Sequence, residues 1–126
     1  MGKVLLFNIS DEKKLTAVRL TGLRFGFEVQ TVLPERQSCT VEQLLRGEDG
    51  ENGTPVFGDE MMLMAGLASQ AFHALLDTLR ENGMPVRLKA VVTEHNRGWT
   101  AERLHRELLA EAQAMEKQKK SIHGRK

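Results

Sequence analysis

Nine residues that could bind a small ligand stand where the expected strands of this chain end and its helices begin. They are Asn8, Ser10, Asp11, Gly66, Ser69, Thr93, Asn96, Trp99 and Thr100. Their hydroxyl, amide and carboxylate groups offer hydrogen bonds, and the single tryptophan offers an apolar wall. Helices that begin nearby also point free backbone amides at the same place, which favours an anion or a carbonyl-bearing ligand. The pattern predicts a binding site built from strand ends.

A second explanation of these residues needs no ligand. Asn96 can close a turn, Thr100 can cap a helix, and Trp99 can pack as a hydrophobic staple. Every residue of the set has a structural role of this kind available to it. The sequence leaves both explanations open and slightly favours local capping.

Enzymatic chemistry has few candidate residues. Asp11 or His95 would serve as the general base of an enzyme that used the same strand ends. The sequence has neither a phosphate-binding glycine–lysine loop nor a nucleophile elbow. Cys39 precedes a probable helix cap, but no basic residue adjoins it to activate the thiol. We therefore assign no catalytic residue and favour a non-catalytic module.

Metal binding is not expected either. The histidines His73, His95, His105 and His123 show no four-residue spacing and have no cysteine close by. A methionine cluster within residues 61–64 fits adaptable core packing better than a thioether metal site. We expect neither a metal ion nor another cofactor.

Two segments, 3–33 and 60–93, share one design of strand, helix and strand, at an offset of 57 residues. In the first, Ser10 or Asp11 is the expected helix cap and Gly26 the stop. In the second, Ser69 is the expected cap. Buried stripes follow on each helix. Their residues are Leu15, Val18, Gly22 and Phe25, then Phe72, Leu75, Leu76 and Leu79.

The four strands predict an order in the sheet. Val4–Phe7 and Met61–Ala65 are apolar on both faces, as in central strands. Phe27–Leu33 and Val86–Thr93 alternate apolar and polar residues, as in edge strands. We predict the α/β class, with a parallel sheet of order 2-1-3-4 and helices on both faces. A ferredoxin-like α+β plait of order 4-1-3-2 is the alternative.

The remaining helices lie in the connection between the halves and at the C-terminal end. Thr40–Gly47 is a short capped helix, and the length of residues 34–60 favours a parallel crossover. A long third helix carries one apolar stripe and should pack on the sheet. The residues of that stripe are Ala101, Leu104, His105, Leu108, Ala112 and Met115.

The length of the chain and the distribution of its charge predict one domain followed by a basic tail. We predict a single domain over residues 1–112 and a basic, frayed or disordered tail over residues 113–126. The tail carries a net charge of +4 and the rest of the chain −3, so binding of nucleic acid through Lys117–Lys126 is the least favoured function. Cys39 is the single cysteine, and no apolar run is long enough for a bilayer, so we expect a cytoplasmic protein without membrane contact. The partner is a small molecule or a protein, and a homodimer is compatible with the sequence.

The second half carries a family resemblance. The run Glu60–Gly66, the strand Leu88–Thr93, and then Asn96 and Trp99-Thr100 with Leu104 and Glu107-Leu108 resemble a bacterial domain-of-unknown-function family, number thirty-seven eighty-three. The resemblance extends over Lys3 to about Glu111. It implies a bacterial source and brings no activity. Ala68 stands where this family commonly has a hydroxyl residue, which leaves the helix cap there open.

Overall fold

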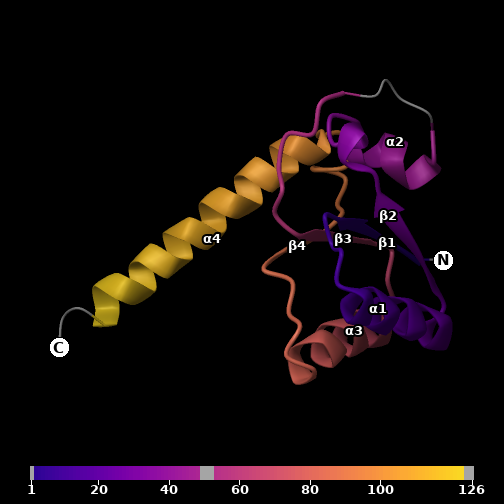
Figure 1. Ribbon diagram of the computed structural model, residues 1–126, viewed down its shortest axis with the longest axis horizontal. Coiled ribbons are helices and arrows are strands. Elements are labelled where there is room, and N and C mark those ends of the chain that lie inside the picture. The colour runs from indigo at the N-terminus through magenta and orange to yellow at the C-terminus, as the bar shows by residue number, and fades with distance from the viewer. Residues whose placement is uncertain (1, 49–52, 124–126) are drawn as a thin grey trace.

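The computed structural model describes residues 2–48 and 53–123, with side chains described as far as residue 118. A four-stranded sheet forms the middle layer, as Figure 1 shows. Helices α1 (Glu12–Phe25) and α3 (Ser69–Glu81) cover one face of this sheet. Helices α2 (Val41–Arg46) and α4 (Ala101–His123) cover the other. The α/β class, with helices on both faces, is confirmed.

The strands are β1 (Gly2–Phe7), β2 (Phe27–Val32), β3 (Met61–Ala65) and β4 (Leu88–Val91). They lie in the order β2-β1-β3-β4. The predicted order is therefore confirmed, and the plait order is not the one observed. The fully apolar strands are the central pair because only there do both faces of a strand meet a helix layer.

The direction of the strands differs from the prediction. β1 pairs parallel with β2, and β3 parallel with β4, but β1 and β3 run antiparallel with Leu5 opposite Leu63. The expectation of an entirely parallel sheet is wrong at this one junction. The two strand–helix–strand halves therefore point in opposite directions within one sheet.

The connection between the halves explains this reversal. It leaves β2 at the end of the sheet where Phe7 lies, and it returns to the same end because Met61 pairs with Phe7. On the way it forms a short 3-10 helix, η1 (Pro34–Arg36), and then α2, which lies over the sheet face. A connection that begins and ends at one end of the sheet reverses the strand direction, so the expected parallel crossover does not occur.

Buried Gln37 holds this returning segment in place. Its amide oxygen accepts hydrogen bonds from the backbone N–H groups of Val56 (2.7 Å) and Phe57 (3.0 Å). Its amide nitrogen donates to the Phe57 carbonyl at 3.0 Å. The Gln37 carbonyl accepts from the Glu102 N–H in the first turn of α4. Gln37, with 1% exposure, thus joins the connection to itself through its side chain and to the last helix through its backbone carbonyl.

The helix ends agree with those predicted from the sequence, with one exception. Asp11 caps α1, and Gly26 ends it in the left-handed conformation at φ 80°. Thr40 and Gln43 form a capping box on α2. On α3 the cap position is occupied by Ala68, without a side-chain hydrogen bond, and Ser69 is already the first helical residue. The predicted capping role of Ser69 is therefore wrong.

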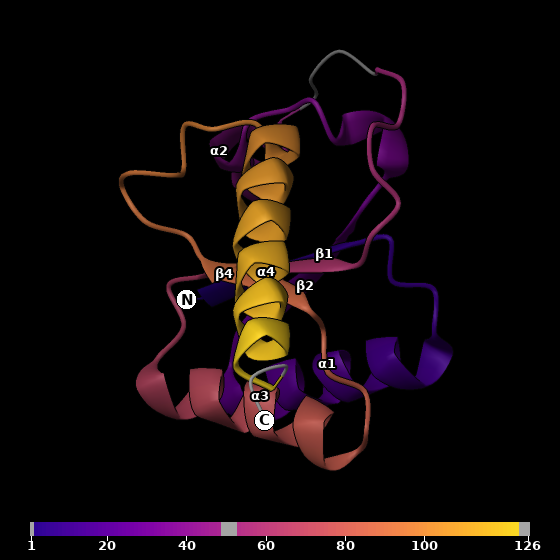
Figure 2. The same ribbon diagram turned by 90° about the vertical axis from the view of Figure 1, so that its left-hand side faces the viewer.

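Helix α4 is only partly packed. Ala101, Leu104 and His105 are buried in the core on the α2 side, and Leu108 and Ala112 are partly buried against it. Met115 lies on the same stripe but is 62% exposed. Figures 1 and 2 show why: α4 runs past β4 and projects from the body. The predicted packing of this helix on the sheet holds for its first half alone.

The division into a domain and a tail stays a prediction. The helix that contains the tail's first residues runs to His123, and the basic side chains from Lys119 onward lie outside the described ones.

Gly22 sets the approach of α1 to β2. A Cβ atom added at Gly22 would lie 2.8 Å from the Phe27 carbonyl oxygen and 3.1 Å from its ring. We expect Gly22→Ala to lower the free energy of unfolding by about 1 to 3 kcal/mol, because backbone must move to relieve this overlap. Urea unfolding measures the change. Gly98→Ala is the control, since nothing lies within 4 Å of its added Cβ. Equal loss in both variants would contradict the close approach.

Gln37 allows a second stability test. Gln37→Ala removes the partner of a buried amide and a buried carbonyl, both of Phe57, and of the partly buried Val56 amide, so we expect a loss of about 2 kcal/mol in the free energy of unfolding. Gln70→Ala, at an exposed position of α3, should change it by less than about 0.5 kcal/mol. Chemical denaturation followed by circular dichroism compares the two. A near-neutral Gln37→Ala would show that these hydrogen bonds do not hold the connection.

Candidate functional site

Seven of the nine residues predicted to share one site lie at opposite ends of the sheet, and the other two, Trp99 and Thr100, lie beside the start of α2, where Thr100 pairs with Thr40. Asn8, Ser10 and Asp11 follow the C-terminal end of β1, which lies beside the beginning of β3. Gly66 and Ser69 follow the other end of β3, and residues 93–100 follow the matching end of β4. The antiparallel pairing of β1 and β3 therefore separates them, and a shared crevice does not form.

Four of these residues, Asp11, Thr93, Asn96 and Thr100, use their side chains in local caps and turns, whereas Asn8 contacts a distant segment of the chain. The Asn8 side chain donates to the carbonyls of Phe57 and Asp59, both at 3.0 Å. Asp11 accepts from the Lys13 and Lys14 amides at the start of α1.

The segment after β4 is similarly engaged. Thr93 and Asn96 exchange hydrogen bonds, since the Thr93 N–H donates to the Asn96 amide oxygen and the Asn96 N–H to the Thr93 hydroxyl. The Thr100 hydroxyl accepts from the Arg103 N–H at 3.1 Å, as a helix cap does. The Arg103 guanidinium lies over the Trp99 ring, 4.0 Å from its centre. These side chains fit the structural explanation of the sequence pattern.

Two small hollows keep parts of the predicted set. Asn8 and Ser10 line one of about 440 Å³ beside the C-terminal ends of β1 and β2. Gly66 lines another of about 450 Å³ at the far end of the sheet, with Lys3 and Arg97. Lys3 Nζ is engaged there with the Leu45 carbonyl at 3.0 Å, and Arg97 lies near Glu42 and Glu94. Neither hollow unites residues from both ends of the sheet.

The titratable residues outside this set form no larger constellation. His105 Nε2 lies 2.8 Å from Asp59 Oδ2, and its ring stacks on Phe57 at a centre distance of 4.0 Å. Cys39 is buried in the core on the α2 side. His95 packs edge-on against Trp99. In the described part of the chain, no three His, Cys, Asp or Glu side chains gather as metal ligands would.

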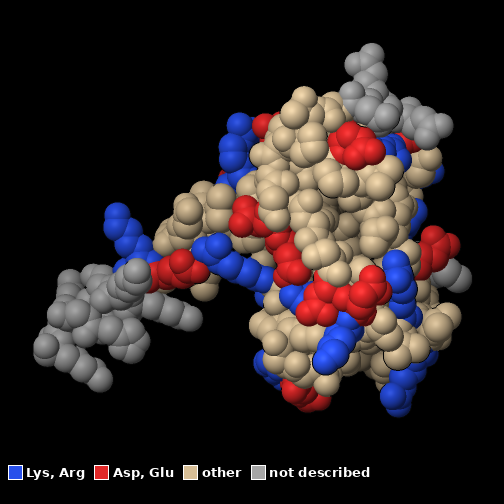
Figure 3. All heavy atoms as spheres, in the orientation of Figure 1, with Lys and Arg blue, Asp and Glu red and all other residues tan. Residues whose placement is uncertain are grey.

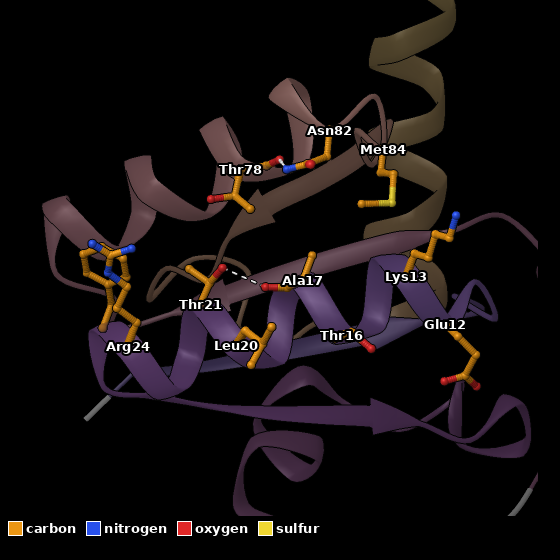
Figure 4. Close-up of a pocket in the computed structure, with 11 residues that line it drawn as sticks. Glu12, Lys13, Thr16, Ala17, Leu20, Thr21, Arg24, Thr78, Asn82 and Met84 are labelled. Atoms are coloured by element: carbon orange, nitrogen blue, oxygen red, sulfur yellow. Dashed lines mark hydrogen bonds between the residues drawn. The ribbon is translucent and has the colours of Figure 1, made fainter.

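Another hollow lies between α1 and α3. It measures about 630 Å³, and Figure 4 shows its lining residues. The lining includes apolar groups from both sides, with Ala17, Leu20 and Phe25 on α1 and Met84 just after α3. Thr21 donates its hydroxyl to the Ala17 carbonyl at 2.7 Å, so this polar group is already satisfied. We call this hollow the α1/α3 groove.

Two basic residues mark the ends of the α1/α3 groove. Lys13 lies in the first turn of α1 and Arg24 in its last, 11 residues apart, which is about 16 Å along a helix. Neither makes an ion pair with another described residue, although Glu12 also lines the groove beside Lys13. Figure 3 shows charged side chains gathered over the lower half of the body, where α1 and α3 lie. The groove thus combines apolar and threonine side chains with Glu12 and Lys13 at one end and Arg24, which lies over the Phe25 ring, at the other.

The sequence analysis missed this groove, although a signal was present. Leu20 and Leu23 fall outside the buried stripe of their helix, and the structure leaves them 59% and 82% exposed. Large apolar residues beside a satisfied core stripe are typical of a surface that binds another molecule. Of the two, Leu20 lines the groove, and the position of Met84 in the same groove depends on the packing of α3 on α1, which the sequence does not specify.

Comparisons with known proteins add a family but no activity. Among the described residues, none of the helices has the length and apolar character needed to cross a membrane. No curated protein and no solved structure matches the chain. Residues 60–115 match the model of a family described as Domain of unknown function (DUF3783), which confirms the predicted resemblance over β3, α3, β4 and the first two thirds of α4.

Proposed function

We propose that this chain is a non-catalytic binding module whose α1/α3 groove holds an apolar helix of a protein partner. The observation that carries the proposal is the groove itself, a hollow of about 630 Å³ with Leu20 exposed at its edge. Isolated exposed leucines are ordinary, but a leucine beside a large hollow offers area that a partner can bury.

The dimensions suit a helix. The groove follows α1 from Lys13 to Arg24, about 16 Å, which is the length of three helical turns. An apolar groove is a usual receptor for an amphipathic helix, which inserts residues spaced three or four apart. A partner helix with acidic residues beside its apolar stripe would also meet Lys13 and Arg24.

We favour a protein partner in the α1/α3 groove over a small ligand bound by the nine residues that the sequence predicted. The nine predicted residues do not meet in one place, and four of their side chains already hold turns and caps. The general-base candidates of the enzyme alternative are likewise separated, since Asp11 caps α1 and His95 packs on Trp99. The nucleic-acid alternative depends on side chains beyond residue 118, so no described contact supports it.

The proposed setting is a bacterial cytoplasm. The family resemblance supports a bacterial source. Cys39 supports a reducing compartment, because the sequence contains no second cysteine with which it could form an internal disulfide.

The proposal predicts binding of a model helix. The probe is a fluorescein-labelled peptide of about 14 residues, four helical turns, with leucines at i, i+3, i+4 and i+7 and glutamates beside them. Fluorescence anisotropy should show saturable binding to the wild-type chain. Leu20→Glu should weaken it by about tenfold or more, because it places a charge against the apolar stripe.

Leu23→Glu is the matched control for this experiment. Leu23 lies on the same helix and is more exposed, but it lines a different hollow with Arg19 and Phe27. It should bind the peptide as the wild type does. Equal binding by the Leu20→Glu chain, or none by the wild type, would refute the proposed function.

A further inference from the structure

We infer that the outer edge of β2 pairs with the same edge of a second copy of this chain, so that the two sheets continue into each other. This inference goes beyond the proposed function, because it uses a surface other than the α1/α3 groove. β2 is the last strand on its side of the sheet. In the described part of the chain, no hydrogen bond to the β2 backbone comes from outside β1. Alternate residues of β2 therefore point unpaired N–H and C=O groups outward, and an extended strand is the structure that matches such a row.

The β2 edge lacks the features that keep most edge strands from pairing. We use this name for the extended run 27–33, since Leu33 continues the strand conformation with φ −64° and ψ 141°. The run contains no proline, lysine or arginine, and Glu28 is its one charged residue. The opposite edge differs: β4 is four residues long and includes Lys89, and α4 packs against it. β2 is therefore the edge at which another strand can add.

Exposed leucines lie at the two ends of the β2 edge. Leu23 of α1 lines a hollow of about 550 Å³ beside the start of β2, together with Phe27 and Val29. Leu33 lies at the other end and is 58% exposed. Side chains alternate along a strand, and Phe27 belongs to the core on the α1 side whereas Val32 belongs to the core on the α2 side. Leu33 therefore points to the α1 side, where the hollow lies.

These two ends are complementary to each other, which favours a second copy over a strand of another protein. Two antiparallel runs 27–33 overlap completely when a two-fold axis passes at Gln30, the middle residue. Phe27 then lies opposite Leu33 of the second copy. Opposite residues in an antiparallel pair share a face, so each Leu33 meets the hollow beside Leu23 of the other copy. The contact forms about six backbone hydrogen bonds and covers the exposed leucines of both copies.

The charges at the edge agree with this register. Arg19 and Glu28 also line the hollow, and neither makes an ion pair with a described residue. With the axis at Gln30, Glu28 lies opposite Val32 of the second copy, and the two Glu28 residues are about 13 Å apart along the strand. An axis at Glu28 would instead oppose two carboxylates, which is unfavourable. Each hollow thus holds one acid and one base and receives the uncharged end of the other strand.

The mass of the full chain in solution, measured by sedimentation equilibrium, tests the pairing. The wild type should be a dimer at about 100 µM and above. Leu23→Glu and Leu33→Glu should each raise the dimer dissociation constant by about tenfold or more, because each places a carboxylate in the apolar contact. Both positions are exposed, so circular dichroism should show both variants folded. Leu20→Glu is the matched control and should remain a dimer, since Leu20 lines the α1/α3 groove instead.

Three results of this experiment would overturn the inference. One is a wild-type chain that stays monomeric up to about 1 mM. Another is a dimer that neither Leu23→Glu nor Leu33→Glu weakens. The third is a dimer that Leu20→Glu weakens as much as they do.

Disulfide cross-linking tests the register. In a Cys39→Ala background, which removes the single native cysteine, Gln30→Cys places two thiols opposite each other with Cα atoms about 5 Å apart. Oxidation with copper–phenanthroline should then give a covalent dimer on a non-reducing gel. Glu28→Cys is the matched control and should not cross-link, because its Cα atoms are about 13 Å apart and a disulfide cannot span them. Cross-linking through Glu28→Cys, or through neither position, would contradict the pairing about Gln30.

The outcomes also separate this inference from the proposed function. A Leu23→Glu chain that is monomeric and still binds the model helix supports both, because it has lost the strand pairing and kept the groove. A wild-type chain that binds the model helix but stays monomeric overturns the strand pairing alone. A dimer that depends on Leu23 and Leu33 yet ignores the model helix overturns the proposed function alone.

Discussion

The antiparallel pairing of β1 with β3 is the constraint on which the rest of this structure depends. Both strands are apolar on both faces, so they must lie at the centre of the sheet with a helix layer on each side. Each central strand then has its parallel partner outside it, β2 or β4, joined through α1 or α3. The crossover helices of both halves lie on one face, and α2 and α4 must cover the other.

The same pairing decides where a site can form. It sends the residues after β1 to one end of the sheet and those after β3 and β4 to the other, so their polar groups turn to local capping. It also sets α1 and α3 beside each other on one face. Two helices packed side by side leave a groove along their outer surface, and Leu20 on α1 makes part of that surface apolar. The candidate site is thus a product of helix packing.

The segment that matches the family model includes the first two thirds of the projecting helix α4. The matched segment, 60–115, ends at Met115, the last large apolar residue of the described stripe. The groove, in contrast, draws most of its lining from α1, outside the matched segment.

Local patterns in the sequence determined the elements of this protein and their order in the sheet. Apolar runs on both faces identified the central strands, alternation identified the edge strands, and Asp11, Gly26 and the Thr40 capping box marked helix ends, because each of these signals depends on neighbours within a few residues. The start of α3 was mispredicted: Ser69 was expected to cap the helix, but it is the first helical residue, and Ala68 occupies the cap position. Strand direction, the separation of Asn8 from Thr93, and the α1/α3 groove were decided only by the tertiary structure. They depend on the path of the connection after β2, which Gln37 fixes through contacts with residues 19 and 20 positions away, and no local pattern encodes such a distance.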